Sequence, residues 1–93
     1  MTDIKRYKAT LTGRVQGVGL RFFAKENANK LGVTGWVKNM PDGTVDMELQ
    51  GKDNVITELV NIIKKGNFII KVETFTAEEI AIVEGEKAFI IKS

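Results

Sequence analysis

The order in which two hydrophobic periods alternate along the chain limits its fold more than any other feature of the sequence. Tyr7, Ala9 and Leu11 alternate with polar residues, and this period of two is typical of a half-buried strand. Apolar residues then recur at helical spacing over residues 20–31, and Gly32 follows them as a helix stop. The pattern predicts that the chain begins with a strand and an amphipathic helix, joined by a glycine-rich stretch.

The middle of the chain predicts a β-hairpin. Residues 33–39 read as a strand, and the Met-Pro-Asp-Gly sequence at residues 40–43 suits a type I turn. After the turn, Val45, Met47 and Leu49 alternate with polar residues, so we expect these three to face the core.

A second helix and further strands complete the predicted order. We expect Asp53 to cap a helix that buries one apolar stripe and ends at Gly66. Residues 70–75 and 88–91 are strand-like, with an acidic, poorly patterned region between them. The order β-α-β-β-α-β indicates one α+β domain over residues 1–93, a ferredoxin-like α/β sandwich with two helices packed on one face of an antiparallel sheet. Because this architecture hosts many unrelated functions, function must be argued from the site.

Composition excludes several kinds of chemistry. The 93 residues include no cysteine and no histidine, which excludes a thiolate nucleophile, a Cys/His zinc site and an imidazole base. Residues 1–38 carry eight basic and two acidic residues, a net charge of +6, and the remainder carries six and ten, a net charge of −4. An anionic ligand would be attracted to the first part, although a solvated mixed-charge surface is the ordinary explanation.

The apolar segments are too short to cross a membrane. The longest apolar runs lie around residues 68–70 and 89–91, far below the length of a transmembrane span. No apolar segment follows the positive charges near the N-terminus, so no secretory signal is visible. We therefore expect a cytoplasmic protein with no membrane partner.

The glycine-rich stretch at residues 13–19 is a candidate anion site. Glycines between a strand and a helix allow backbone N–H groups to turn inward, and the helix N-terminus adds further donors and a positive dipole end. Arg21 falls in the first helical turn, where a bound anion would compensate for its charge and where its guanidinium could hold two phosphate oxygens. The alternative is that Gly17 and Gly19 make a tight connection and that Arg21 is a solvated surface residue.

Two motifs resemble those of one enzyme family. GRVQGVGLR at residues 13–21 resembles the first signature of the acylphosphatases, and GWVKN at residues 35–39, followed by DGTV at residues 42–45, resembles the second. The motifs lie in the expected order and separation, and the predicted topology agrees with the family fold over the whole chain. The resemblance implies a hydrolase that splits acyl phosphates, the mixed anhydrides of carboxylic acids and phosphate, into carboxylate and inorganic phosphate.

The resemblance also implies roles for individual residues. Arg21 would bind the phosphoryl oxygens and Asn39 would orient the attacking water, so these two are the catalytic candidates. The backbone N–H groups of the phosphate-binding loop would come from Val15, Gln16, Gly17, Val18, Gly19 and Leu20. Three features depart from the family pattern. Leu20 stands where an aromatic residue is usual, Met40 stands where a small hydroxylic residue is common, and Lys92-Ser93 replaces an Arg-Tyr ending.

The chemistry is feasible for the residues present. An acyl phosphate has a good carboxylate leaving group, so the main requirement is charge stabilisation and placement, which Arg21 and N–H donors could supply without a metal or cofactor. Asn39 cannot act as a base, but its carbonyl can accept a hydrogen bond from water. A strand-end asparagine also commonly begins a turn, and the two roles are compatible. We expect Asp42 in the turn and Asp46 on an outward face to be solvated rather than catalytic.

Two rival functions fit the same topology. An RNA-recognition domain needs exposed aromatic residues on its central strands, and the strand at residues 44–50 has none, so we expect no nucleic-acid partner. We expect Trp36 and Phe23 to belong to the core instead. The second rival is an anion-binding accessory domain, which release of phosphate in the presence of a chelator would distinguish from an enzyme. We expect a monomer that acts on a small acyl phosphate, with inorganic phosphate or sulfate as a ligand of the same site.

Overall fold

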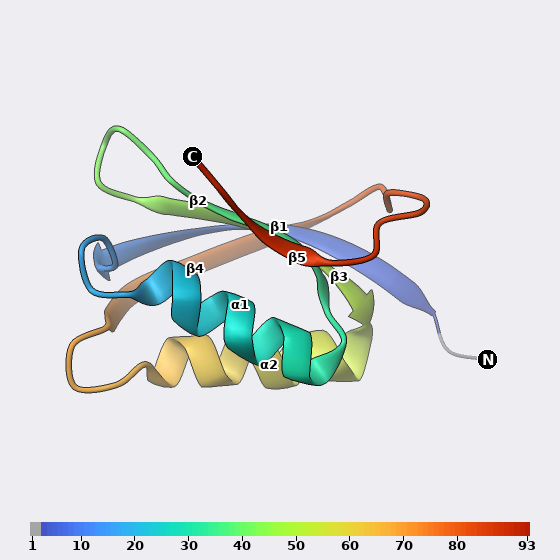
Figure 1. The fold of residues 1–93 in the computed structure, drawn as a ribbon, viewed down its shortest axis with the longest axis horizontal. Helices are drawn as coiled ribbons and strands as arrows, with labels where there is room; N and C mark the ends of the chain where they lie inside the picture. The colour runs from blue at the N-terminus through green and yellow to red at the C-terminus, as the bar shows by residue number, and fades with distance from the viewer. Residues whose placement is uncertain (1–2) are drawn as a thin grey trace.

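A computed structural model describes residues 3–93, which form a five-stranded sheet with two helices on one face (Figure 1). The elements in chain order are β1 (Ile4–Arg14), α1 (Leu20–Leu31), β2 (Thr34–Asn39), β3 (Val45–Lys52), α2 (Asp53–Lys65), β4 (Lys71–Ile80) and β5 (Phe89–Lys92). The predicted ferredoxin-like arrangement is thus confirmed. Of the N-terminal segment considered for a secretory signal, residues 1 and 2 lie outside the described part.

One strand pair differs from the antiparallel sheet that we expected. The strand order is β4-β1-β3-β2-β5, and every pair is antiparallel except β2 and β5, which are parallel. β5 runs parallel to β2 because of where the β4–β5 connection starts. β4 ends at the end of the sheet at which β2 begins, so the chain enters β5 from that same end. β5 is a seventh element beyond the six-element order, and its parallel pairing with β2 makes the sheet mixed. β4 also extends to Ile80, beyond the expected end at residue 75, because its ladder with β1 continues into the acidic region.

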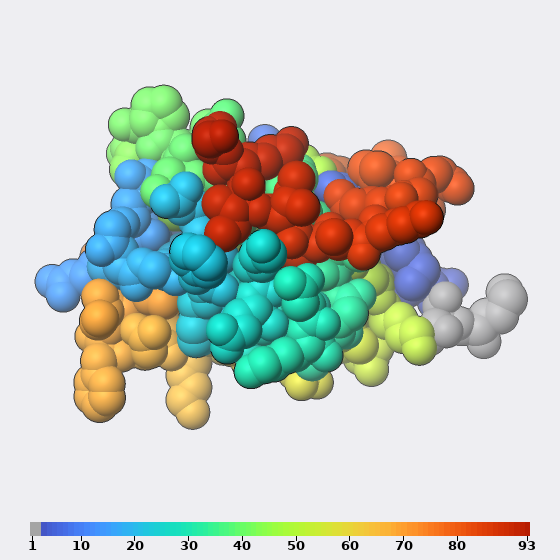
Figure 2. Space-filling view, viewed as in Figure 1, coloured from blue at the N-terminus to red at the C-terminus, as the bar shows by residue number. Residues whose placement is uncertain are grey.

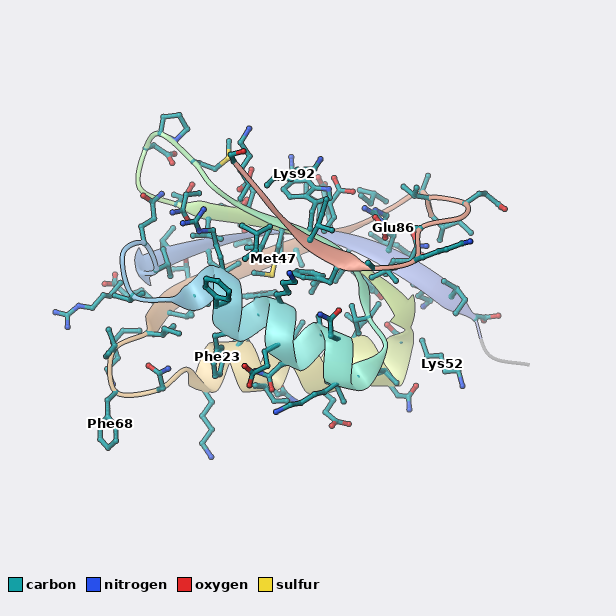
Figure 3. All side chains as sticks on the ribbon, in the orientation of Figure 1. Phe23, Met47, Lys52, Phe68, Glu86 and Lys92 are labelled. Carbon is teal, nitrogen blue, oxygen red and sulfur yellow. The ribbon has the colours of Figure 1, made fainter. Side chains whose placement is uncertain are left out.

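The hydrophobic core lies between the sheet and the helices. Val45, Met47 and Leu49 face the helices as predicted, and all three are fully buried; Figure 3 shows Met47 between the sheet and the helices. The helices add one buried stripe each, made of Leu20, Ala24 and Ala28 on α1 and of Ile56, Leu59 and Ile63 on α2. Burial of each large aliphatic side chain contributes about 1.5–3 kcal/mol. Neither helix of the described residues combines the length and the apolar character that spanning a membrane requires.

Both helices end as predicted, but α2 begins differently. Gly32 and Gly66 follow the two helices, and their N–H groups donate to carbonyls of the last turns. The N-cap of α2 is Lys52, which has an extended backbone and no side-chain cap, so the expectation that Asp53 caps the helix is wrong. β3 runs directly into α2 and places Asp53 inside the first turn. There its Oδ1 accepts a hydrogen bond from the Tyr7 hydroxyl at 2.8 Å.

The face of the sheet opposite the helices carries a buried ionic cluster, the Arg6 cluster, which consists of Arg6, Glu48, Gln50 and Glu86. Arg6 is only 2% exposed, and it donates from Nε to Glu48 at 2.6 Å and from its two Nη atoms to Glu86 at 2.7 and 3.2 Å. The side-chain amide of Gln50 accepts from Arg6 at 3.0 Å. It also accepts from the Val83 N–H at 2.8 Å and donates to the Val83 carbonyl at 2.9 Å. These contacts fasten the β4–β5 connection to the outer face, where Figure 3 shows Glu86.

Trp36 also lies on the outer face, so the expectation that it belongs to the core is wrong. Its neighbour Val37 is fully buried toward the helices, and strand alternation turns Trp36 the other way. The Trp36 ring is half-buried, and the Lys92 Nζ lies 4.5 Å from its centroid in a cation–π contact. Phe23 packs against the core, as expected.

Candidate active site

The residues predicted to hold phosphate form a short loop at one end of the molecule. β1 ends at Arg14 and α1 begins at Leu20, so residues 15–19 connect a strand to a helix. Figures 1 and 2 show this blue loop at the same end as the green turn between β2 and β3. The buried side chains of Val15 and Leu20 anchor both ends of the loop in the core, while the segment between them stays partly exposed.

Gly17 and Gly19 give the loop its shape. Both adopt the left-handed backbone conformation, with φ values of 70° and 79°, which other residues adopt only at a cost. A Cβ atom at either position would meet no atom within 4 Å. The need for glycine is therefore conformational rather than steric, and the space beside both residues is open.

The backbone N–H groups of the loop are available to a ligand. No acceptor within residues 3–93 takes a hydrogen bond from the N–H groups of residues 16–20. Gly19 is the N-cap of α1 and supplies no side-chain cap, and the first turn contains no acidic residue. The N-terminus of α1 therefore presents unpaired donors together with the positive end of the helix dipole. Such a group of donors suits an anion.

Arg21 lies in the first turn of α1, directly after the loop. Its side chain is half-buried, and no carboxylate of the described residues lies within 4.0 Å of its guanidinium. A cation at this end of a helix opposes the dipole, at a cost of about 0.3–1 kcal/mol. An anion held by the loop would offset that cost.

Asn39 is the last residue of β2 and shares a face with the buried residues Gly35 and Val37. This face is covered by the helices, and α1 begins at the same end of the sheet (Figure 1). The Oδ1 of Asn39 is buried and accepts no hydrogen bond from any described residue. An unpaired buried acceptor costs about 1–3 kcal/mol. Because an unpaired buried oxygen is unfavourable, the side-chain amide of Asn39 is a candidate for binding a ligand or a water molecule.

The side chain of Gln16 joins the loop to the hairpin. Its Nε2 donates to the carbonyl oxygens of Met40 and Thr44, at 2.8 Å each. The predicted turn is confirmed, because the Gly43 N–H donates to the Met40 carbonyl at 3.1 Å. The sequence prediction used only the backbone N–H of Gln16 and missed its side chain. The one signal was a long amide in a loop of small and apolar residues, and nothing in the sequence identifies partners 24 and 28 residues away.

The two aspartates near the hairpin have structural positions. Asp42 Oδ1 accepts from the Thr44 hydroxyl at 2.7 Å and from the Thr44 N–H at 3.1 Å. These hydrogen bonds, the hydroxyl first, hold the pKa of Asp42 below its ordinary value. Asp46 lies on the outer face, where the Thr10 hydroxyl donates to it at 2.9 Å. Both residues therefore occupy the turn and the outward face on which the sequence placed them.

The basic first part of the chain contributes less to the loop than its net charge suggests. Arg6 is buried near the other end of β1, and its charge is balanced by Glu48 and Glu86. Arg14 and Lys71 are exposed and lie opposite each other where β1 meets the loop. Together with Arg21 of α1, these two residues place positive charge at this end of the sheet.

The departures from the family pattern are compatible with this geometry. Leu20 is a core residue that anchors the start of α1. Met40 contributes its backbone carbonyl to Gln16, a contact that does not depend on its side chain. Lys92 contacts Trp36, so the last strand is held to β2 without an Arg-Tyr ending.

Known proteins match the chain over nearly its full length. The family model for acylphosphatase matches residues 7–91. An acylphosphatase from Clostridium beijerinckii is 46% identical over 87 residues, which cover 94% of this chain and 97% of that protein. The crystal structure of acylphosphatase from Bacillus subtilis matches with a TM-score of 0.90 at 36% identity, and the match covers 96% of this chain and 99% of that one. Full-length HypF, in a phosphate- and nucleotide-bound form, matches with a TM-score of 0.87 at 26% identity, over 100% of this chain but 12% of HypF. By its sequence and by its fold, the chain belongs to the acylphosphatase family.

Proposed function

We propose that this acylphosphatase hydrolyses acyl phosphates by metal-free attack of a water molecule that Asn39 orients. The phosphoryl group is held by the N–H groups of residues 15–20 and by the guanidinium of Arg21. The proposal depends on the N–H donors of residues 16–20, which have no acceptor among residues 3–93, at the uncapped start of α1, with Arg21 in its first turn.

Charge stabilisation is the main task of the loop. The phosphoryl oxygens carry negative charge throughout the transfer, and the carboxylate departs readily without a general acid. Pre-arranged N–H donors and a guanidinium stabilise this charge where it develops, and loss of one such donor typically costs about 10²–10³ in rate. Histidine and cysteine, which the chain lacks, are not needed.

Asn39 supplies the position of the nucleophile. Its buried, unpaired Oδ1 is an acceptor for one O–H of the attacking water, which fixes the direction of approach. The water oxygen forms a bond to phosphorus, and the bond from phosphorus to the acyl oxygen breaks. The proton of the water passes to a phosphate oxygen, so the products are a carboxylate and inorganic phosphate.

Release of inorganic phosphate from acetyl phosphate, in the presence of excess EDTA, tests the activity directly. Turnover that survives the chelator supports the metal-free mechanism. Turnover that disappears with EDTA and returns with a divalent cation would contradict it. The same samples on a sizing column test the monomer that we propose.

Arg21→Gln tests the anion-binding role of the helix. The variant should bind inorganic phosphate more weakly and lose nearly all turnover, while its circular dichroism spectrum stays unchanged. Lys25→Gln is the matched control, because it removes one positive charge from the same helix one turn further on. Equal losses in both variants would indicate a general charge effect and would exclude a specific role for Arg21.

A binding module without turnover is the second candidate. The observation that favours it is the match to HypF, in which this fold makes up a small part of a longer chain. Phosphate binding without any acetyl phosphate hydrolysis would support this alternative. We also propose a cytoplasmic location, which fractionation of cells and detection with an antibody would test.

A further inference from the structure

We infer that the side chain of Gln16 is a positioning residue for the reaction, because it sets where Asn39 stands relative to the phosphate-binding loop. The inference rests on the proposed function, in which the loop holds the phosphoryl group and Asn39 orients the water. Gln16 then serves both halves of the site. Its backbone N–H belongs to the loop, and its side chain holds the hairpin that carries Asn39.

Both hydrogens of the Gln16 amide are used in this contact. Nε2 carries two hydrogens, and it lies 2.8 Å from the carbonyl oxygen of Met40 and 2.8 Å from that of Thr44. These two residues flank the turn and are themselves joined, since the Met40 N–H donates to the Thr44 carbonyl at 2.9 Å. One side-chain amide is therefore hydrogen-bonded to both sides of the turn. Because it binds backbone atoms, it fixes the path of the chain at the residue that follows Asn39.

The end of β2 has few other anchors among the described residues. The ladder between β2 and β5 reaches as far as Lys38, opposite Lys92. Asn39 is paired with Val45 of β3 and has no β5 partner. Beyond this pair the chain turns back. The contact between this turn and the phosphate-binding loop is made by the Gln16 amide.

The relative position of loop and hairpin determines whether the water is aligned with phosphorus. A misplacement of 1 Å in an active site can cost about 10² in rate. Removal of the Gln16 amide leaves the loop anchored by the buried side chains of Val15 and Leu20. Phosphate binding should therefore persist, while the orientation of the water is lost.

Gln16→Met removes both donors and keeps the length of the side chain. We expect kcat for acetyl phosphate to fall roughly 10- to 100-fold, while KM and the affinity for inorganic phosphate change by less than about threefold. Asn61→Met is the control, because it makes a similar substitution at an exposed position on α2 and should leave both constants unchanged. A Gln16→Met variant with wild-type kcat, or with greatly weakened phosphate binding, would overturn the inference.

A double variant separates positioning from general stabilisation. If Gln16 acts through Asn39, then Gln16→Met should cause little further loss of kcat in the Asn39→Ala background. Losses that multiply would show that Gln16 acts independently of Asn39 and would overturn the inference. Gln16→Asn, which keeps the amide on a shorter stem, provides a milder change if the methionine variant does not fold. It should also lower kcat with phosphate affinity retained, and a fully active Gln16→Asn would likewise refute the role.

The inference and the proposed function fail in different ways. Absence of turnover in the wild-type protein would contradict the proposed function itself. A wild-type enzyme that Asn39→Ala inactivates, but that Gln16→Met leaves fully active, would contradict the role of Gln16 alone.

Discussion

Glu86→Gln tests how the Arg6 cluster holds the β4–β5 connection on the sheet. Glu86 accepts two hydrogen bonds from the buried Arg6 guanidinium and is itself only 18% exposed. Burial alone would raise the pKa of Glu86, but the hydrogen bonds from Arg6 and Thr34 outweigh it and hold the pKa below the ordinary value. The substitution keeps the shape of the side chain and removes its charge.

The expected loss of unfolding free energy depends on which partners of Arg6 the substitution removes and which it leaves. A hydrogen bond to a charged group contributes about 1.5–3 kcal/mol, and removal of one partner from a buried ion pair costs about 3–5 kcal/mol. Arg6 still has Glu48 at 2.6 Å after the substitution, so its charge stays paired. We therefore expect a loss within the hydrogen-bond range, about 2 kcal/mol at pH 7. For a chain of this size, that loss corresponds to a fall in Tm of roughly 8–16 °C.

The effect should depend on pH with a defined sign. The pKa of Glu86 is lower in the folded than in the unfolded chain, so its stabilisation is present at pH values above the ordinary 4.5. It is lost as the pH falls through the lower, folded value. The difference between Glu86→Gln and the wild type should therefore be large at pH 7 and should shrink under strongly acidic conditions.

Urea unfolding at neutral and acidic pH measures these differences. Glu84→Gln is the matched control, because Glu84 is an exposed glutamate in the same connection. The control should unfold like the wild type, and neither variant should change kcat, since the cluster lies at the end of the sheet opposite the loop. If Glu86→Gln and Glu84→Gln unfold at the same urea concentration at pH 7, the Arg6 cluster does not stabilise the connection.

Two further predictions concern the active site. Gly19→Ala should lower the free energy of unfolding by about 1–2 kcal/mol, because the left-handed backbone is unfavourable for alanine, and it should also weaken phosphate binding. Thermal unfolding measures the first effect and phosphate titration the second. Unchanged phosphate affinity would contradict the loop geometry. Asn39→Ala should lose most of its turnover without loss of stability, because it removes an unpaired buried acceptor that costs about 1–3 kcal/mol. Marked destabilisation in urea unfolding would show instead that this oxygen is bonded in the folded protein.

Much of the fold was predictable because the relevant signals are local. The period of two in β1 and β3, the apolar stripe of each helix and the glycines that end the helices depend on residues a few positions apart. The loop at residues 13–19 and the position of Arg21 in the first turn could be predicted for the same reason, because their signals also come from neighbouring residues. The cap of α2 was mispredicted although it is also local, because only the direct passage of β3 into the helix places Asp53 one residue too late to cap it.

The sequence by itself therefore determined the order of the elements, the core faces of β3 and of the helices, and the candidate phosphate-binding loop. Tertiary structure decided the parallel pairing of β5, the outward position of Trp36, the burial of Arg6 and the hydrogen bonds from Gln16 to the hairpin. These features join residues far apart in the chain, as far as 80 positions in the pair of Arg6 and Glu86. Such partners are chosen by which strands become neighbours in the sheet, and no short-range pattern of one sequence records that choice.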